Sequence, residues 1–294
     1  MLIHRFSSLG FMLTAGLLLN GCASQPSDPI GKLTIGIVSY DSGERTVEQY
    51  QQFKDYLARQ TQAVVELEPA FNELQAVEQI QKQNEWSIVF APPGLAAIAI
   101  SEAQYVPIFP IQGIPNLRSV LVVEEDSEIE SIGDLANTVI ALGEPGSATG
   151  YYLPLYDLYG LTLQEVRFAP TPRTVLEWIS AGEVVAGAIA EPEFQRYENE
   201  FPDTDFRILH TSRVVPIGAV LVGPTVDRNQ QQQIETAMQE APSNIVGDAG
   251  YIPNYDVPNY DQFIQLVEKV RPLEAQILQQ PAVLTLPAES DDAE

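Results

Sequence analysis

Strand-type and helix-type segments alternate along most of this 294-residue chain, in two successive blocks. In the first block, apolar runs at residues 33–38, 63–67 and 86–90 are separated by segments whose apolar side chains recur at spacings of three and four. The second block shows the same alternation between residues 119 and 190. Strands that alternate with helices are typical of mostly parallel sheets covered by helices. The sequence therefore predicts an α/β protein with two such lobes.

The ends of the blocks predict how the lobes are joined. Residues 220–222 form a strand-type run that we expect to return to the first lobe, and an amphipathic helix closes the chain between Phe263 and Ile277. The first lobe then comprises residues 32–112 and 216–284, and the second comprises residues 113–215. Two chain crossings between lobes, expected near residues 112–117 and 210–215, make a hinge, and small ligands bind in the cleft outside the carboxyl ends of the strands.

Local signals mark several helix ends. Ser131 is placed to cap a short helix with Asp134 at the third helical position, and Ser147 stands at the start of another. Gly160 and Gly182 follow apolar periodic segments and are expected to end helices.

The N-terminus is typical of a bacterial export signal. His4 and Arg5 precede an apolar run at residues 9–19, and Cys22, the single cysteine of the sequence, follows Gly21. This arrangement resembles a lipoprotein signal in which the cysteine is lipidated and becomes the new N-terminus. We expect a signal peptide over residues 1–21, the lipidated Cys22 and a tether over residues 22–31, and an acidic disordered tail over residues 285–294. An ordinary signal peptide or membrane anchor with an incidental cysteine is the alternative.

Composition narrows the classes of function. The formal net charge is −25, with 40 acidic residues against 15 basic ones, which disfavours binding to nucleic acid or to anionic lipid. Removal of the signal peptide on export would leave His210 as the one histidine of the chain. One histidine gives too few ligands for an ordinary zinc site and is a poor basis for a Ser-His-Asp triad. We expect no cofactor, no metal and a monomer. An extracytoplasmic enzyme that uses a carboxylate pair stays an unfavoured alternative.

The segment at residues 142–154 leaves a predicted strand and opens a predicted helix. Backbone N–H groups at a helix start carry partial positive charge, and the Ser147 and Thr149 hydroxyls add donors beside them. Gly146 and Gly150 permit close approach of a ligand to the backbone. These features favour a site for a small oxyanion. A serine cap and a tight turn that bind no ligand would have the same sequence pattern.

The same segment resembles the Asp-Pro-x-Ser-x-Ser-Gly stretch of the phosphate/phosphite/phosphonate-binding proteins of ABC importers, the PhnD-like family. Glu144 stands in place of the aspartate, and Ser147 and Thr149 in place of the two serines. Residues 118–135 and 182–188 resemble further family patterns, and the resemblance runs from about residue 33 to residue 224. It implies a type II periplasmic-binding-protein fold on the periplasmic side of the cell envelope. It also implies capture of a phosphorus oxyanion by hinge closure and an ABC permease partner in the inner membrane.

The chain departs from the family pattern at three places. A family tyrosine is absent at residues 92–96, a histidine of phosphonate binders is replaced within residues 170–173, and an aspartate is replaced by Val185. A different ligand, or a sensor or structural role without transport, therefore remains an alternative. The candidate ligand-binding residues are Tyr40, Ser42, Pro93, Gly94, Ser147, Ala148, Thr149, Gly150, Thr171 and Glu191.

Overall fold

The structure, a computed structural model, describes residues 31–38, 47–82 and 85–286. The predicted signal segment and Cys22 lie outside the described residues, as do Tyr40, Ser42 and the predicted tail from residue 287 onward. Within the described part of the chain, no helix is long and apolar enough to cross a membrane.

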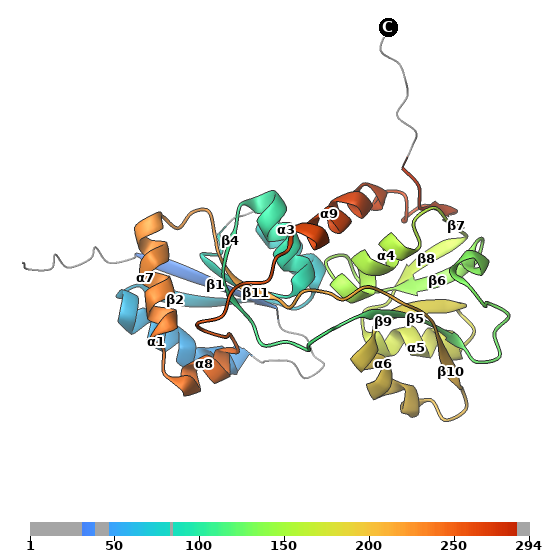
Figure 1. The fold of residues 1–294 in the computed structure, drawn as a ribbon, viewed down its shortest axis with the longest axis horizontal. Helices are drawn as coiled ribbons and strands as arrows, with labels where there is room; N and C mark the ends of the chain where they lie inside the picture. Colours follow the sequence, from blue (N-terminus) through green and yellow to red (C-terminus); the bar gives the residue numbers. More distant parts are fainter. Residues whose placement is uncertain (1–30, 39–46, 83–84, 287–294) are drawn as a thin grey trace, which may run out of the picture.

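The first lobe is built on a five-stranded sheet in the order β2-β1-β3-β11-β4. Its central strand β3 places Ile88 and Phe90 in one apolar cluster and Val89 and Ala91 in another, as the two-residue period of a strand requires. Helices therefore cover both faces of the sheet (Figure 1). The elements of this lobe are β1 (Lys32–Val38), η1 (Val47–Tyr50), α1 (Gln51–Thr61), β2 (Val64–Ala70), α2 (Glu73–Lys82), β3 (Ile88–Ala91), α3 (Pro93–Ala103), β4 (Val106–Pro110), β11 (Ala219–Val222), α7 (Arg228–Gln239) and α8 (Ser243–Ala249).

The second lobe is built on another five-stranded sheet, in the order β10-β5-β9-β6-β8. Its buried strands β6 and β9 are almost wholly apolar, which is typical of strands covered on both faces. The elements of this lobe are β5 (Ser119–Glu124), η2 (Ile132–Leu135), β6 (Val139–Leu142), η3 (Ala148–Tyr152), α4 (Leu153–Asp157), β7 (Thr162–Leu163), β8 (Glu165–Phe168), α5 (Pro172–Ser180), β9 (Ala186–Ala190), α6 (Glu191–Tyr197), η4 (Glu198–Glu200) and β10 (Phe206–Thr211).

The predicted α/β class with two lobes of mostly parallel sheet is confirmed, and each sheet is mixed because one of its five strands runs against the other four. Strand β11 runs antiparallel to β3 and β4, and β5 runs antiparallel to β9 and β10. The remaining strand pairs in the two sheets are parallel. His210 also lies in the edge strand β10, not in the chain crossing where we expected it. The strands at the crossings reverse direction because each enters its sheet directly from the other lobe, without a helical crossover.

Several local signals have the predicted consequences. Ser131 and Asp134 form a reciprocal capping box at η2, and the hydrogen bonds from Ser131 hold the pKa of the Asp134 carboxyl below its usual range. Gly160 and Gly182 adopt positive φ angles of 103° and 67° after helices.

The C-terminal segment connects the lobes a third time. Helix α9 (Asp261–Val270) packs against α3 of the first lobe and α4 of the second, as Figure 1 shows in red above both lobes. After η5 (Arg271–Leu273), the strand β12 (Ala282–Val283) pairs with β7. This segment falls in the range that the sequence assigned to the first lobe, and those lobe boundaries stay predictions.

Candidate functional site

The site is built around a loop at the carboxyl end of β6, residues 143–150, here called the anion loop. Gly143 donates its N–H to the Gly150 carbonyl oxygen at 2.9 Å, which closes the loop. Gly146 has a φ of 105°, a region that L side chains rarely adopt. Ser147 caps the following helix η3, because its Oγ accepts the Gly150 N–H at 3.0 Å. The sequence alone therefore accounts for the turn and for the cap.

Two backbone donors of the anion loop remain available. The N–H groups of Tyr151 and Tyr152 both donate to the Ser147 carbonyl oxygen, at 3.2 and 3.0 Å, which opens the first turn into a π-helix. The N–H groups of Ala148 and Thr149 make no hydrogen bond to any of the described residues. They lie at a helix start, where the partial positive charge favours an anion. The Ser147 hydroxyl keeps its own proton as a third donor, since its oxygen acts as acceptor in the cap.

The first lobe approaches the anion loop very closely. An ideal Cβ placed on Gly94, in the first turn of α3, would lie 1.9 Å from the Gly146 carbonyl oxygen. A Cβ placed on Gly146 would lie 2.6 Å from Cβ of Glu73, at the start of α2. Only glycines fit at these two positions, so the helix starts of the first lobe are in contact with the loop of the second.

A cavity of about 480 Å³ lies beside this contact, between the lobes. Its walls come from the ends of strands and the starts of helices in both lobes, the positions where ligands bind in such sheets. From the first lobe and the chain crossing, the lining residues are Phe71, Asn72, Glu73, Pro92, Pro93, Ile114 and Leu117. From the second lobe they are Gly143, Glu144, Ser147, Ala148, Thr149, Gly150, Ala169, Pro170, Thr171, Pro172, Arg173, Val175, Ala188, Ile189, Ala190, Pro192, Glu193 and Tyr197.

The cavity wall carries more carboxylates than cations among its described residues. Glu73, Glu144 and Glu193 line it together with Arg173. The Arg173 guanidinium donates from Nε to Glu200 at 2.8 Å and from an Nη to Glu177 at 3.4 Å. These neighbours raise the pKa of the Arg173 guanidinium, with the Glu200 hydrogen bond as the largest cause. The guanidinium is thus held by surface carboxylates, and the anion donors are those of the anion loop.

Most of the predicted binding residues come together at the cavity. Pro93, Thr171 and the four loop residues from Ser147 to Gly150 line it. Gly94 lies behind the wall and contacts the anion loop instead. Glu191 lines a smaller neighbouring pocket of about 300 Å³ with Arg118, and its N–H donates to the Arg118 carbonyl oxygen.

Sequence reasoning missed the first-lobe wall at Phe71, Asn72 and Glu73. The strand before them was expected to end at Leu67, but β2 continues through Pro69 to Ala70. Proline is tolerated because β2 is the edge strand of its sheet, where one side of the backbone needs no ladder hydrogen bond. Placing the strand end correctly would have identified these residues, because ligands bind outside the carboxyl ends of strands in such sheets.

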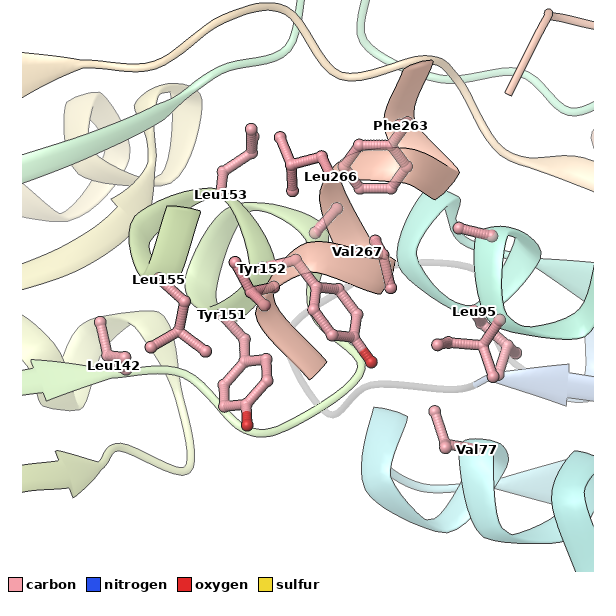
Figure 2. Close-up of a cluster of buried hydrophobic side chains, with 14 of the residues drawn as sticks. Val77, Leu95, Leu142, Tyr151, Tyr152, Leu153, Leu155, Phe263, Leu266 and Val267 are labelled. Carbon is pink, nitrogen blue, oxygen red and sulfur yellow. The ribbon is translucent and has the colours of Figure 1, made fainter. Parts of the chain in front are cut away.

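The two tyrosines after the anion loop belong to the core. Tyr151 and Tyr152 are each 1 % exposed and pack edge to face, with ring centroids 5.2 Å apart. Burial raises the pKa of both phenols well above the usual value. Figure 2 shows Tyr152 among side chains of both lobes, including Leu95 and Leu155. The anion loop is therefore anchored to a rigid apolar support.

Among the described residues, no group of three or more His, Cys, Asp or Glu side chains is placed to hold a metal ion.

Comparisons with solved structures establish the fold. A Xanthomonas citri protein solved with ATP superposes with a TM-score of 0.66 at 19 % identity, covering 82 % of this chain and 98 % of that one. PhnD1 from Prochlorococcus marinus, solved in complex with methylphosphonate, superposes with a TM-score of 0.60 at 14 % identity, and the match covers 81 % of this chain and 97 % of that one. The binding-protein component of a phosphonate ABC transporter from Pseudomonas aeruginosa superposes with a TM-score of 0.59 at 15 % identity, and the match covers 85 % of this chain and 89 % of that one.

Comparison with curated protein sequences gives no match. Residues 35–250 match the family described as "ABC transporter, phosphonate, periplasmic substrate-binding protein", which spans most of the chain and includes the anion loop and the cavity. The members of this family are substrate-binding proteins, not enzymes. The chain therefore belongs to the phosphonate-binding family of periplasmic substrate-binding proteins of ABC transporters, with the type II binding-protein fold.

Proposed function

We propose that this protein is a lipid-anchored receptor that captures a phosphonate or a related phosphorus oxyanion between its lobes and delivers it to an ABC permease. The observation that carries this proposal is the pair of N–H groups of Ala148 and Thr149, which make no hydrogen bond to the described residues and lie beside the Ser147 hydroxyl on the wall of the interlobe cavity. A tetrahedral oxyanion presents several acceptor oxygens, and hydrogen bonds to a charged acceptor are the strong kind.

Capture would use hinge movement about the chain crossings. The second lobe supplies the anion donors, and the first supplies the opposite wall at Phe71 and Pro93. A ligand that contacts both walls stabilises the arrangement in which they face each other, so it shifts the population toward the closed form. A permease could then distinguish loaded from empty receptor by this shape.

The double variant Ser147→Ala, Thr149→Ala tests the anion site. The full-length chain, purified in detergent, is heated with methylphosphonate, phosphite, phosphate or sulfate. A ligand at 100 times its dissociation constant adds about 2.7 kcal/mol to the free energy of unfolding. Losing hydrogen bonds to a charged group costs about 1.5–3 kcal/mol each, so we expect the variant to lose most of the ligand-induced rise in melting temperature.

The matched control is Ser131→Ala. Ser131 also caps a short helix but does not line the cavity, so this variant loses a cap without losing a ligand contact. Its melting temperature should fall while the ligand-induced rise is retained. A rise that persists in the double variant would remove the Ser147 and Thr149 hydroxyls from the site, and a wild-type protein that responds to none of the anions would refute the proposal.

The lipid anchor is tested separately at Cys22. The sequence predicts that the mature chain begins with a lipidated Cys22, and two or more acyl chains hold a protein on a membrane far better than one. Mass spectrometry of the N-terminal peptide should show a lipid adduct, and Cys22→Ser should move the protein out of the membrane fraction. A mature N-terminus downstream of residue 22 would contradict lipidation.

A further inference from the structure

Two large apolar side chains that are exposed to solvent line the cavity. Phe71 and Ile114 are 64 % and 51 % exposed, and both line the same interlobe space. Apolar groups that stay open to water in a concave site are typical of ligand contacts, since burying them on binding releases water. Neither group can contribute to binding an oxyanion, so they face another part of the ligand.

The backbone around Phe71 is held in place. Its N–H donates to the Gln75 side-chain oxygen at 2.9 Å, and the Gln75 N–H donates to the Asn72 side-chain oxygen at 2.8 Å. These bonds cap α2 with Asn72 and leave Phe71 just before the helix. A position fixed before binding lowers the entropic cost of a contact made there.

The cavity is larger than an oxyanion head group needs. Its volume of about 480 Å³ falls within the roughly 300–1,000 Å³ of pockets that bury drug-sized ligands. The first lobe already touches the anion loop at Gly94 and Glu73, so this volume does not come from walls held wide apart. Methylphosphonate, with its single carbon, would leave most of this space to water.

The charges on the wall limit what the rest of the ligand can be. Three carboxylates, those of Glu73, Glu144 and Glu193, line the wall, and the Arg173 guanidinium beside them is shared with Glu177 and Glu200, so the described lining offers little positive charge to a second anionic group. A ligand with several phosphates therefore fits this cavity poorly. A single anionic head with an uncharged apolar substituent fits both the donors of the anion loop and the exposed apolar wall.

We infer that the site selects phosphonates with a bulky apolar or aromatic substituent, which packs against Phe71 and Ile114 while the anion loop binds the head group. This inference rests on the proposed function. The ligand class is thus an organophosphonate larger than methylphosphonate.

Titration calorimetry on the full-length protein in detergent tests the inference with benzylphosphonate, methylphosphonate and 2-aminoethylphosphonate. Burying the phenyl group against the wall should make benzylphosphonate bind at least about tenfold more tightly than methylphosphonate. Phe71→Ala should remove most of this preference, so that the ratio of the two dissociation constants approaches one. Tyr255→Ala is the matched control, because Tyr255 is 72 % exposed and does not line the cavity. It should keep the wild-type ratio.

The outcomes separate this inference from the proposed function. Tighter binding of methylphosphonate or 2-aminoethylphosphonate than of benzylphosphonate would overturn the inference and leave a phosphonate receptor. A preference for benzylphosphonate that survives Phe71→Ala would show that Phe71 does not contact the substituent, which would also overturn the inference. Failure of all three ligands to bind to a protein that still responds to phosphite or phosphate would overturn the inference alone. Failure of every one of these anions would overturn both the inference and the proposed function.

Discussion

Replacement of Gly94 by alanine is expected to weaken ligand binding about a hundredfold or more, because the added methyl group keeps the lobes from meeting at the anion loop. Its Cβ would lie 1.9 Å from the Gly146 carbonyl oxygen and 3.0 Å from the Ala148 nitrogen. Both are backbone atoms, which no change of side-chain rotamer can move aside. The first-lobe wall must therefore withdraw from the second lobe, and a ligand loses its contacts with that wall.

The size of this effect follows from the population of the closed form. A bias of about 2.8 kcal/mol against the closed arrangement lowers the apparent affinity a hundredfold. Calorimetry with the tightest-binding phosphonate measures the affinity, and small-angle X-ray scattering measures whether the ligand still compacts the molecule. We expect both responses to be reduced together.

The control for Gly94 is Gly247→Ala. Gly247 lies within α8, and an added Cβ there would meet nothing within 4 Å. Alanine in a helix interior should raise the free energy of unfolding by about 0.5–1 kcal/mol and leave affinity unchanged. Wild-type affinity in Gly94→Ala would show that contact between α3 and the anion loop is not part of the bound state.

Replacement of Tyr152 by alanine is expected to lower the free energy of unfolding by about 3–5 kcal/mol, the usual cost of deleting a large buried ring. Tyr152 is 1 % exposed and belongs to the apolar cluster that contains Leu95 of the first lobe and Leu266 of α9. Figure 2 shows the ring among these side chains. Because Tyr152 ends the π-helix that starts at the anion loop, its loss also loosens the support of that loop.

Urea denaturation measures the change. Tyr152→Phe keeps the ring and should cost far less than the alanine variant, while Tyr255→Ala, at an exposed site, should stay within about 0.5 kcal/mol of wild type. A Tyr152→Ala variant that loses less than about 1 kcal/mol would contradict the role of this cluster, given the usual cavity cost.

The sequence by itself determined the features that depend on neighbouring residues. The apolar periods located the main strands and helices, and the capping box of Ser131 and Asp134 formed as predicted. The turn at Gly146, the Ser147 cap and the donors that follow them could also be derived from the order of residues in one short segment. These features are local because each hydrogen bond or backbone angle involves residues only a few positions apart.

The tertiary structure decided what depends on distant segments. The antiparallel entry of β5 and β11 follows from the path of the chain between lobes, which no hydrophobic period encodes. The wall at Phe71 became visible only when β2 proved to be an edge strand that passes through Pro69. The contact of Gly94 with Gly146 and the position of α9 against both lobes likewise join residues far apart in sequence. Such contacts arise from packing whole elements together. The amino-acid sequence alone therefore predicts an anion-binding loop, while the shape of the cavity around the loop is set by the tertiary fold.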